Sequence, residues 1–263
     1  MLATLPGLRR VEHVMGMPLV LDVRDDDVDA AVLDELLGWL RWVDAVFSTY
    51  QEESEISRLN RGELAPAGLH REVVAVLDRC EELREETGGY FDVCAASPGV
   101  VDPSGLVKGW AVDRAAAMLD DAGLRNYAIN LAGDMRLRGR AAPDWCWRVG
   151  IQHPLERDKV ARVIETTGLA IATSGEYARG EHVFDPHTHC APRGILSVTI
   201  TGPELATADA YATAAFAMGA DRAVHWTARL RGYEAMSILA DGRVLSTPGF
   251  GTGFGTGAAR STA

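Results

Sequence analysis

Apolar residues recur along this chain with both of the periods that distinguish helices from strands. A spacing of three and four residues predicts helices over residues 28–47, 54–60, 71–87, 108–122, 206–219 and 222–230. Alternation predicts strands over residues 19–24, 127–131, 135–137, 145–151, 161–165, 170–173 and 195–201, and a hairpin joining 234–239 to 244–246. Because helices and strands are mixed without strict alternation, we expect an α+β fold.

The C-terminal segment differs from the rest of the chain in composition. Residues 249–257 read Gly-Phe-Gly-Thr-Gly-Phe-Gly-Thr-Gly, and no helix pattern follows them, so they fail as a nucleotide-binding fingerprint. The 263 residues, 47% of them hydrophobic, are enough for a full core. We therefore expect one domain over residues 1–248 and a disordered Gly-rich tail over residues 249–263.

Charge and cysteine usage narrow the class of protein. The formal net charge is -11, which argues against nucleic-acid binding because that function needs a basic surface. The four cysteines are far apart and contain no Cys-x-x-Cys, which favours buried thiols in a reducing compartment. The chain shows no secretory leader pattern and no apolar run of transmembrane length, so we expect a cytoplasmic protein without membrane insertion.

The Ala-rich helix over residues 206–219 carries Asp209 and Thr213, four residues apart. This spacing puts a carboxylate and a hydroxyl on one helix face, one turn apart. Hard oxygen ligands of this kind suit Mg²⁺, which shares the rest of its shell with water and phosphate. The alternative is structural: an Asp near a helix N-terminus complements the macrodipole, and a helical Thr bonds a preceding carbonyl.

Five polar clusters fall at the ends of predicted elements, where sites are commonly built. They are residues 88–93, read as a turn into a strand; 102–113, read as a glycine-broken loop running into a helix; 130–134; 172–177; and 182–190. The second cluster offers backbone N–H groups and Lys108 to a phosphate, although its glycine spacing is not that of a Walker loop.

Residues 182–190 could also form a zinc site. Its possible ligands are His182, Asp185, His187, His189 and Cys190. His187 and His189 lie in a turn that contains a proline, and the sequence offers no second ligand cluster. A plain surface turn is therefore the alternative at these residues.

Together these clusters resemble the ApbE family, the FAD:protein FMN transferases, over nearly the whole chain. The matching segments are Met15-Gly-Met17, Ser48-Thr-Tyr50, Ser54-Glu-Ile-Ser-Arg-Leu-Asn60, Gly89-Tyr-Phe-Asp92, Asp102-Pro-Ser-Gly-Leu-Val-Lys-Gly109, Asn130-Leu-Ala-Gly-Asp134, Ala172-Thr-Ser-Gly175, His182-Val-Phe-Asp-Pro-His-Thr-His189 and Ala208-Asp-Ala-Tyr-Ala-Thr213. Each segment is weak by itself, but their shared order is specific. The chain departs from the family pattern at Met17, where the family has Thr, and at Ala132 and His189, where it has Gly.

The resemblance implies a single domain with a mixed, largely antiparallel sheet and packed helices. It implies an Mg²⁺-dependent enzyme that transfers the FMN moiety of FAD to a threonine of an acceptor flavoprotein through a phosphoester bond, with release of AMP. Asp209, Thr213 and the carbonyl of Gly105 fall on the family's metal ligands. FAD contacts are implied for Met15, Tyr50, Phe91, Asp92, Asp102, Lys108 and Phe184, and His182 is the candidate acid or base.

The physical chemistry of the reaction agrees with this assignment. Phosphoryl transfer needs charge neutralisation more than covalent catalysis, which suits Mg²⁺ and Lys108. The family's acceptor consensus, roughly Asp-x-x-Thr-x-Ala-Thr, does not occur in this chain, so transfer is expected in trans. Two alternatives stay open: an FAD pyrophosphatase that makes FMN and AMP, and a non-catalytic FAD-binding protein. The sequence names neither the acceptor nor the oligomeric state.

Overall fold

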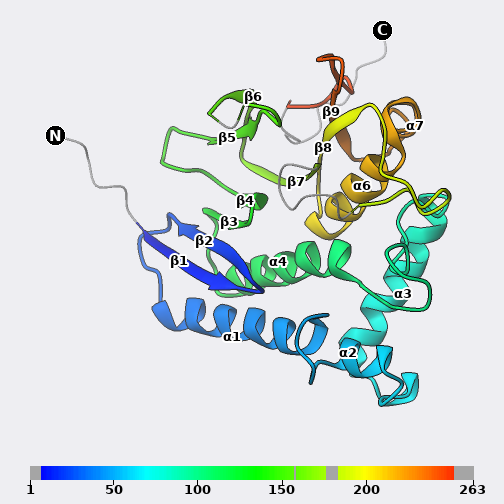
Figure 1. Cartoon of the computed structure of the whole chain (residues 1–263). Coiled ribbons are helices and arrows are strands. Elements are labelled where there is room, and N and C mark those ends of the chain that lie inside the picture. Colours follow the sequence, from blue (N-terminus) through cyan, green and yellow to red (C-terminus); the bar gives the residue numbers. More distant parts are fainter. Residues whose placement is uncertain (1–6, 157, 176–182, 252–263) are drawn as a thin grey trace, which may run out of the picture.

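An eight-stranded antiparallel sheet organises the computed structural model, which describes residues 7–156, 158–175 and 183–251 (Figure 1). Its strands are β1 (Leu8–Val14), β2 (Met17–Val23), β3 (Tyr127–Leu131), β4 (Asp134–Arg138), β7 (Gly168–Gly175), β8 (Ile195–Gly202), β9 (Glu234–Leu239) and β10 (Val244–Ser246), in the order β1-β2-β3-β4-β7-β8-β9-β10. A separate two-stranded sheet pairs β5 (Trp147–Gln152) with β6 (Val160–Thr166). The expected α+β fold is confirmed, and every strand pair in it is antiparallel.

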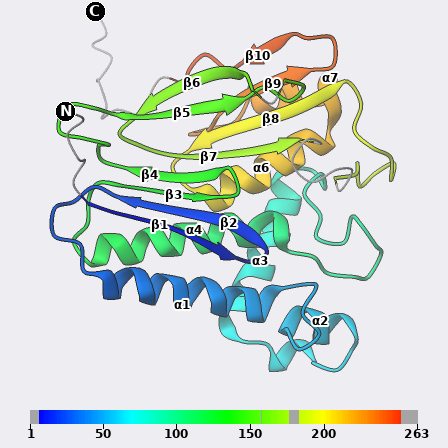
Figure 2. The same ribbon diagram turned by 60° about the vertical axis from the view of Figure 1, so that its left-hand side comes forward.

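The large sheet has two similar halves, each made of two hairpins with helices inserted between them. In the first half, the chain leaves β2, forms the helices α1 (Ala30–Phe47), α2 (Glu55–Asn60), η1 (Pro66–Gly68), α3 (Arg71–Glu86) and α4 (Ser104–Asp121), and returns to β3 beside β2. In the second half, α6 (Leu205–Ala217) and α7 (Gly219–Thr227) lie between β8 and β9. These two insertions bring α4 and α6 together against the same face of the sheet (Figure 2).

Alternating side chains of the central strands enter two different cores. On β7, Ala170 and Ala172 belong to the core beneath the helices, whereas Leu169 and Ile171 belong to the core beneath the β5–β6 sheet. A strand covered on both faces reads as a continuous apolar run, as residues 169–172 do. The sheet therefore lies between a helical layer on one face and the β5–β6 hairpin on the other.

Aromatic side chains join α1 to α4. The rings of Trp39 and Trp42 stack with their centroids 5.0 Å apart, and Trp110 of α4 lies 5.2 Å from Trp39 and 5.4 Å from Phe47. The indole N–H of Trp39 donates a hydrogen bond of 3.2 Å to the carbonyl of Ala111. Aromatic contacts of this kind add to the stabilisation that burial alone provides, so α1 forms a fixed support for α4.

The start of α4 differs from the prediction. We expected the helix to begin at Lys108, because Gly105 suggests a loop, but it begins at Ser104. The carboxylate of Asp102 accepts a hydrogen bond of 3.0 Å from the backbone N–H of Ser104, which satisfies one of the free donors at the helix start. Gly105 and Gly109 therefore both lie inside the helix. There, the lack of a side chain lets neighbouring segments approach closely.

Two further local predictions are corrected. Residues 88–93 form the expected turn but no strand follows, because Asp92 closes a new turn by accepting a hydrogen bond of 2.8 Å from the N–H of Cys94. Conversely, β1 was not predicted, although it pairs with β2 along its whole length. Its charged residues and its position at the sheet edge weaken the apolar alternation.

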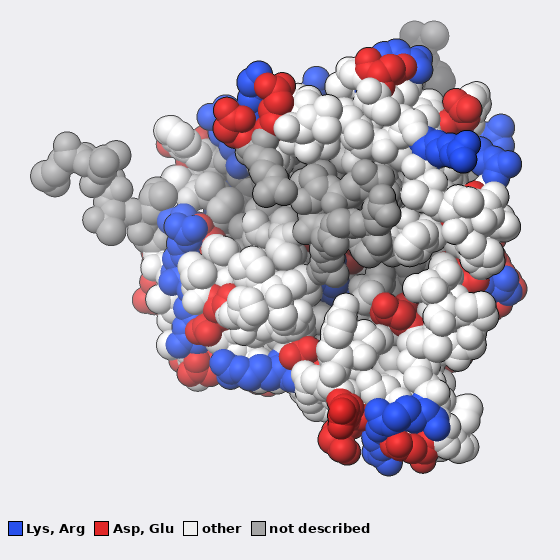
Figure 3. Space-filling model, viewed as in Figure 1, with Lys and Arg blue, Asp and Glu red and all other residues white. Residues whose placement is uncertain are grey.

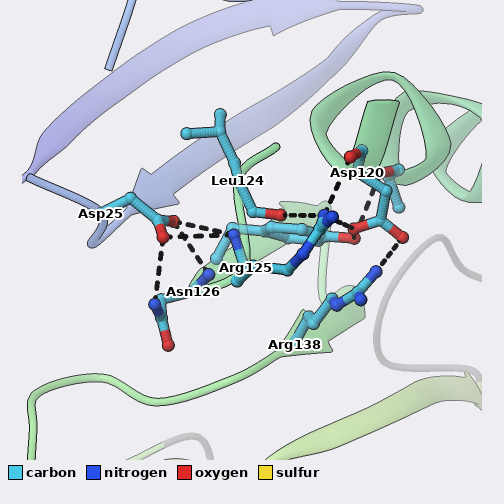
Figure 4. A network of polar contacts seen from close by, with 8 residues as sticks. Asp25, Asp120, Leu124, Arg125, Asn126 and Arg138 are labelled. Atoms are coloured by element: carbon cyan, nitrogen blue, oxygen red, sulfur yellow. Dashed lines mark hydrogen bonds and ion pairs between the residues drawn. The ribbon is translucent and has the colours of Figure 1, made fainter. Parts of the chain in front are cut away.

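A polar network joins the end of α4 to the start of β3 (Figure 4). The carboxylate of Asp25 accepts hydrogen bonds from the backbone N–H groups of Arg125 and Asn126 at 2.9–3.2 Å. Asp120 accepts a hydrogen bond of 2.8 Å from the hydroxyl of Tyr127 and forms an ion pair with Arg138. This network fixes the end of α4 to the start of β3, and so sets the position of α4 along the sheet.

The packed chain continues past Pro248, where we placed the end of the domain. The side chain of Phe250 is only 4% exposed and belongs to the core beneath the β5–β6 sheet. The backbone N–H of Gly249 donates a hydrogen bond of 3.1 Å to Glu234, which holds the preceding turn against β9. Residues 252–263 of the expected tail lie outside the described residues.

Candidate active site

The helices α4 and α6 meet through glycine at the centre of the candidate site. A Cβ atom at residue 109 would lie 2.5 Å from the carbonyl oxygen of Leu205, so only glycine permits this approach. The contact brings the beginning of α4 against the beginning of α6 (Figure 1). The residues that it gathers include Gly105 and Lys108 from α4, and Asp209 and Thr213 from α6.

Asp113 fixes the same helix pair one turn further along α4. Its carboxylate accepts a hydrogen bond of 2.8 Å from the N–H of Ala206, a donor that has no partner inside α6. Arg136 on β4 lies 3.5 Å from the same side chain. Burial raises the pKa of Asp113, against the lowering effect of these hydrogen bonds and of Arg136. The first turn of α6 is therefore positioned by both α4 and the sheet.

Lys108 forms ion pairs with two buried aspartates. Asp134, which is 2% exposed, contacts the ammonium directly, and the nearest oxygen of Asp209, which is 4% exposed, lies 3.7 Å from it. Asp134 also accepts a hydrogen bond of 3.0 Å from the N–H of Thr173 on β7. Lys108 thus joins carboxylates from β4 and α6 in one buried group of charged side chains.

The hydroxyl of Thr213 lies beside the carboxylate group. It is 3.4 Å from the hydroxyl of Ser174 on β7 and 3.6 Å from the position that a Cβ atom of Gly105 would occupy. That same position is 3.1 Å from the ring of Phe91, so a larger residue at 105 would crowd both neighbours. Glycine at this point keeps the space between α4 and α6 narrow.

These residues suit magnesium better than zinc. Within the described residues, no group of three or more His, Cys, Asp or Glu side chains is arranged to hold a metal ion. The oxygens near Asp209 are instead a mixed set of carboxylate, hydroxyl and backbone groups. Such hard oxygen ligands match Mg²⁺, which needs only a few protein ligands when phosphate and water complete its shell. The chemistry of the donor set therefore fits this ion.

Two adjoining cavities open beside this group, and both are lined by Asp102, Ser104 and Lys108. The phosphate cavity, as we call the first, has a volume of about 150 Å³ and is also lined by Phe91, Asp92, Gly105, Phe184, Asp209 and Thr213. The apolar cavity has a volume of about 490 Å³ and is also lined by Met15, Met17, Val43, Phe47 and Tyr50. An extended ligand with a polar middle and a planar end would fit this pair of cavities.

The structure gathers the sequence-predicted site residues around these cavities, with one exception. Every residue assigned to FAD or to the metal lines one cavity or both: Met15, Tyr50, Phe91, Asp92, Asp102, Gly105, Lys108, Phe184, Asp209 and Thr213. His182, the candidate acid or base, lies outside the described residues. Its neighbours in sequence, Val183 and Phe184, line the phosphate cavity.

Several site residues received no role from the sequence. Asp134 lay in a recognised segment, but its ion pair with Lys108 depends on the crossing of α4 and β4. The serines of the segment that ends at Asn60 were also unassigned. Ser54 and Ser57 donate hydrogen bonds of 2.5 and 3.2 Å to the carbonyl of Ser48, which fixes the loop that carries Tyr50.

Asn60 positions the chain that enters α4. Its side chain donates a hydrogen bond of 2.9 Å to the carbonyl of Val101 and accepts one of 2.8 Å from the N–H of the same residue. Val101 directly precedes Asp102, which lines both cavities. Asn60 is the last residue of α2 and its partner lies 41 residues further along the chain, so the local segment does not reveal this role.

Three residues near the cavities adopt a left-handed backbone conformation without being glycine. Met15, Ala132 and His189 each have φ of 53°. Ala132 and His189 occupy positions where the family has glycine, and the structure shows why glycine is suited to them. Met15 and Ala132 lie in the tight turns β1–β2 and β3–β4 and also line the cavities. Each such residue costs of the order of 1 kcal/mol, and such strain is typical of functional sites.

Figure 3 shows the face of the molecule seen in Figure 1, on which many charged side chains of the described residues lie towards the rim. Positive and negative groups alternate along the rim, and no basic stripe crosses the described part of this face. Within the described residues, no helix is both long and apolar enough to cross a membrane.

The fold and the site define a class of protein with a helix-covered antiparallel sheet and a polar cleft between α4 and α6. Residues 15–99 and 96–237 match the model of the ApbE family, so the chain belongs to the ApbE family. The flavin transferase ApbE from Vibrio cholerae has a similar structure, with a TM-score of 0.83 and 23% sequence identity, over 92% of this chain and 97% of that chain. At this identity the likeness supports the fold alone.

Two curated relatives are FAD:protein FMN transferases. The protein of Vibrio cholerae is 36% identical over 132 residues, which cover 46% of this chain and 40% of the relative. The protein of Salmonella typhimurium is 30% identical over 157 residues, which cover 56% of this chain and 45% of the relative. The matched part of the chain thus spans less than half the length of these relatives.

Proposed function

We propose that this protein transfers the FMN moiety of FAD to a threonine of an acceptor protein, with magnesium as cofactor. The observation that carries the proposal is the group of Lys108, Asp134, Asp209 and Thr213 between two adjoining cavities. This group supplies positive and negative charge where a diphosphate would lie, and the larger cavity supplies an apolar surface for a ring system. Family membership and the names of the curated relatives support the same assignment.

Asp209, Thr213 and the carbonyl of Gly105 would hold the magnesium ion. When bound, Mg²⁺ neutralises charge on the diphosphate. Lys108 would bind a diphosphate oxygen and stabilise the negative charge that develops as the bridging bond breaks. Its ion pairs with Asp134 and Asp209 hold the ammonium in place before substrate arrives, so little reorganisation is needed during the reaction.

In the proposed reaction, the hydroxyl oxygen of the acceptor threonine forms a bond to the phosphorus of the FMN moiety. The bond from that phosphorus to the bridging oxygen breaks, and AMP leaves with the electron pair. The threonine proton passes to a base, for which His182 is our candidate because it precedes residues that line the phosphate cavity.

We also propose that the reaction takes place in the cytoplasm, since all four cysteines are free thiols.

The test is an assay of products by mass spectrometry. The protein is incubated with FAD, MgCl₂ and an acceptor domain containing Asp-x-x-Thr-x-Ala-Thr, and AMP is measured in parallel. We expect the acceptor to gain the FMN moiety while one AMP is released for each transfer. A Thr→Ala acceptor is the matched control and should gain no mass.

The same assay distinguishes the alternative activities. If FMN appears only free in solution, at equal rates with and without acceptor, the protein is a pyrophosphatase. If FAD binds but neither FMN nor AMP forms, it is an FAD-binding protein. The proposed diphosphate site further predicts tighter binding of FAD than of riboflavin in a fluorescence titration, because riboflavin lacks the groups that Lys108 would bind.

A further inference from the structure

Two chain segments that line the phosphate cavity are joined by the side chain of His187. Val183 and Phe184 line one side of this cavity, and Tyr90, Phe91 and Asp92 line another. These segments are far apart in the sequence, and no strand pairing joins them. The ring of His187 lies against the second segment, which makes this side chain the candidate that fixes their separation.

The contact of His187 is specific in its geometry. Its Nε2 atom lies 3.1 Å from the carbonyl oxygen of Gly88, and its ring centroid lies 4.6 Å from that of Tyr90 in an edge-to-face arrangement. A Cβ atom at residue 89 would lie 3.2 Å from the imidazole, so the ring rests directly on the glycine backbone. Tyr90 is in turn held by Arg222 of α7 through its hydroxyl.

Hydrogen bonds close the turn that carries His187. Asp185 accepts hydrogen bonds of 2.9 Å at its side chain from the N–H of His187 and of 2.7 Å at its carbonyl from the N–H of His189. The N–H of Asp185 donates a hydrogen bond of 2.9 Å to the carbonyl of Cys190 and closes the turn. His187 therefore projects from the tip of a closed turn that begins beside Phe184.

The other wall is equally well fixed. The hydroxyl of Thr87 donates a hydrogen bond of 2.7 Å to the carbonyl of Leu83 at the end of α3 and accepts one of 2.9 Å from the N–H of Phe91. Gly88 and Gly89, with φ of 64° and 85°, turn the chain so that the carbonyl of Gly88 faces His187. Two stiff segments are thus joined at one exposed point.

From this arrangement we infer that His187 is a positioning residue, which sets the width of the phosphate cavity by joining the Asp185–Cys190 turn to the Gly88–Tyr90 turn. It does not line the cavity itself, but it contacts Tyr90, which does. The His187 ring bonds to the main chain at Gly88. It would therefore affect FAD only by holding the chain segments that carry Phe91 and Phe184 at a fixed separation. The consequence for FAD rests on the proposed function, whereas the joining of the two turns does not.

The first experiment uses the protein without FAD, and so is independent of the proposed function. Hydrogen exchange is followed by mass spectrometry in the wild type, His187→Ala, His187→Gln and His189→Asn. Because one exposed hydrogen bond is lost, exchange across residues 88–92 should accelerate about three- to tenfold in His187→Ala. Gln retains a donor that can reach Gly88 and should restore slow exchange. Unchanged exchange in His187→Ala would overturn the inference.

His189→Asn is the matched control, since it changes the neighbouring histidine of the same turn and Asn tolerates the left-handed conformation of that residue. It should exchange like the wild type at residues 88–92. An equal acceleration in this variant would show that the turn as a whole, rather than His187, makes the junction.

The second experiment measures FAD binding and turnover in the same four proteins. His187→Ala should raise the Kd and KM for FAD about fivefold while kcat changes less than twofold, and Gln should restore both constants. If exchange accelerates but the affinity for FAD is unchanged, the positioning role is refuted. If the wild type itself fails to bind FAD, the proposed function fails, and the exchange experiment alone decides whether His187 joins the turns.

Discussion

The two faces of the large sheet differ in the size of the core that covers them and in the chemistry that they support: the core under the helices is much the larger. The helical face holds α4 and α6 at glycine contacts and buries Lys108, Asp134 and Asp209 between them. The hairpin face, covered by β5, β6 and Phe250, buries an apolar core and, on β8, the uncharged polar side chains of Thr199 and Thr201. The hairpin face therefore contributes to stability alone, whereas the helical face contributes to stability and also carries the charged residues of the candidate site.

The largest effect is expected from Asp209→Ala on the helical face. Loss of one preorganised electrostatic group should lower the rate of FMN transfer by about 10²-fold or more. Asp221→Asn, which changes an exposed carboxylate on the neighbouring helix α7, is the control and should keep full activity. Transfer is measured by acceptor mass, and the fold by circular dichroism. Near-normal transfer by Asp209→Ala would remove this residue from the metal site.

Phe250→Ala tests the hairpin face. Truncating a large buried side chain costs about 3 kcal/mol, so the free energy of unfolding in urea should fall by that amount while the affinity for FAD stays the same. A chain that ends at Gly251 is the control, because it retains Phe250, and its stability should equal that of the full chain. Weaker FAD binding in Phe250→Ala would show that the two faces are coupled.

Gly109→Ala should affect stability and activity together, since residue 109 lies where α4 and α6 meet. The added methyl group would lie 2.5 Å from the carbonyl oxygen of Leu205 and force the helices apart, at a cost of about 1–3 kcal/mol. FMN transfer should also fall, because Lys108 and Asp209 would separate.

Gly38→Ala in α1 is the matched control for this variant. A Cβ atom at residue 38 meets nothing within 4 Å, so alanine there should raise the free energy of unfolding by up to about 1 kcal/mol through its better helix propensity. If both glycine variants are equally stable, the close approach at Gly109 is not a constraint on the site.

The smallest effect is expected from Ala132→Gly, in the tight turn between β3 and β4. Because residue 132 has φ of 53°, glycine should relieve strain and raise the free energy of unfolding by about 1 kcal/mol or less. Ala128→Gly, in the regular part of β3, is the control and should lower it. A destabilised Ala132→Gly would show that the methyl group makes a packing contact that outweighs the strain.

The sequence predicted the elements best where a single rule dominates. The long helix α1 has continuous apolar spacing, and the prediction missed its start by two residues. The strands β3, β9 and β10 were predicted with their observed bounds. The start of α4 was missed because glycine has poor helix propensity, and propensity carries no information about the close contact at Gly109.

The candidate site was predicted by residue type but not by arrangement. Local segments identified Lys108, Asp209 and Thr213, and all three line the phosphate cavity. The ion pair of Lys108 with Asp134 and the hydrogen bonds of Asn60 with Val101 could not be predicted, because each joins segments whose separation in space is set by the fold. The burial of Phe250 was missed for the same reason. Its glycine-rich surroundings suggest a disordered segment, but the side chain packs in the core between β9 and the β5–β6 sheet.

The helical insertion between β2 and β3 has a consequence for how the chain folds. These strands are neighbours in the sheet, but residues 24–126 separate them in the sequence. Closing a loop of that length costs about 4 kcal/mol of chain entropy, whereas the β1–β2 and β3–β4 hairpins each close over a few residues. Local hairpins and helices therefore form before the β2–β3 ladder, and the α1–α4 layer shortens the effective loop before the strands pair. Closure of this ladder is the slow step that we expect to limit the folding rate.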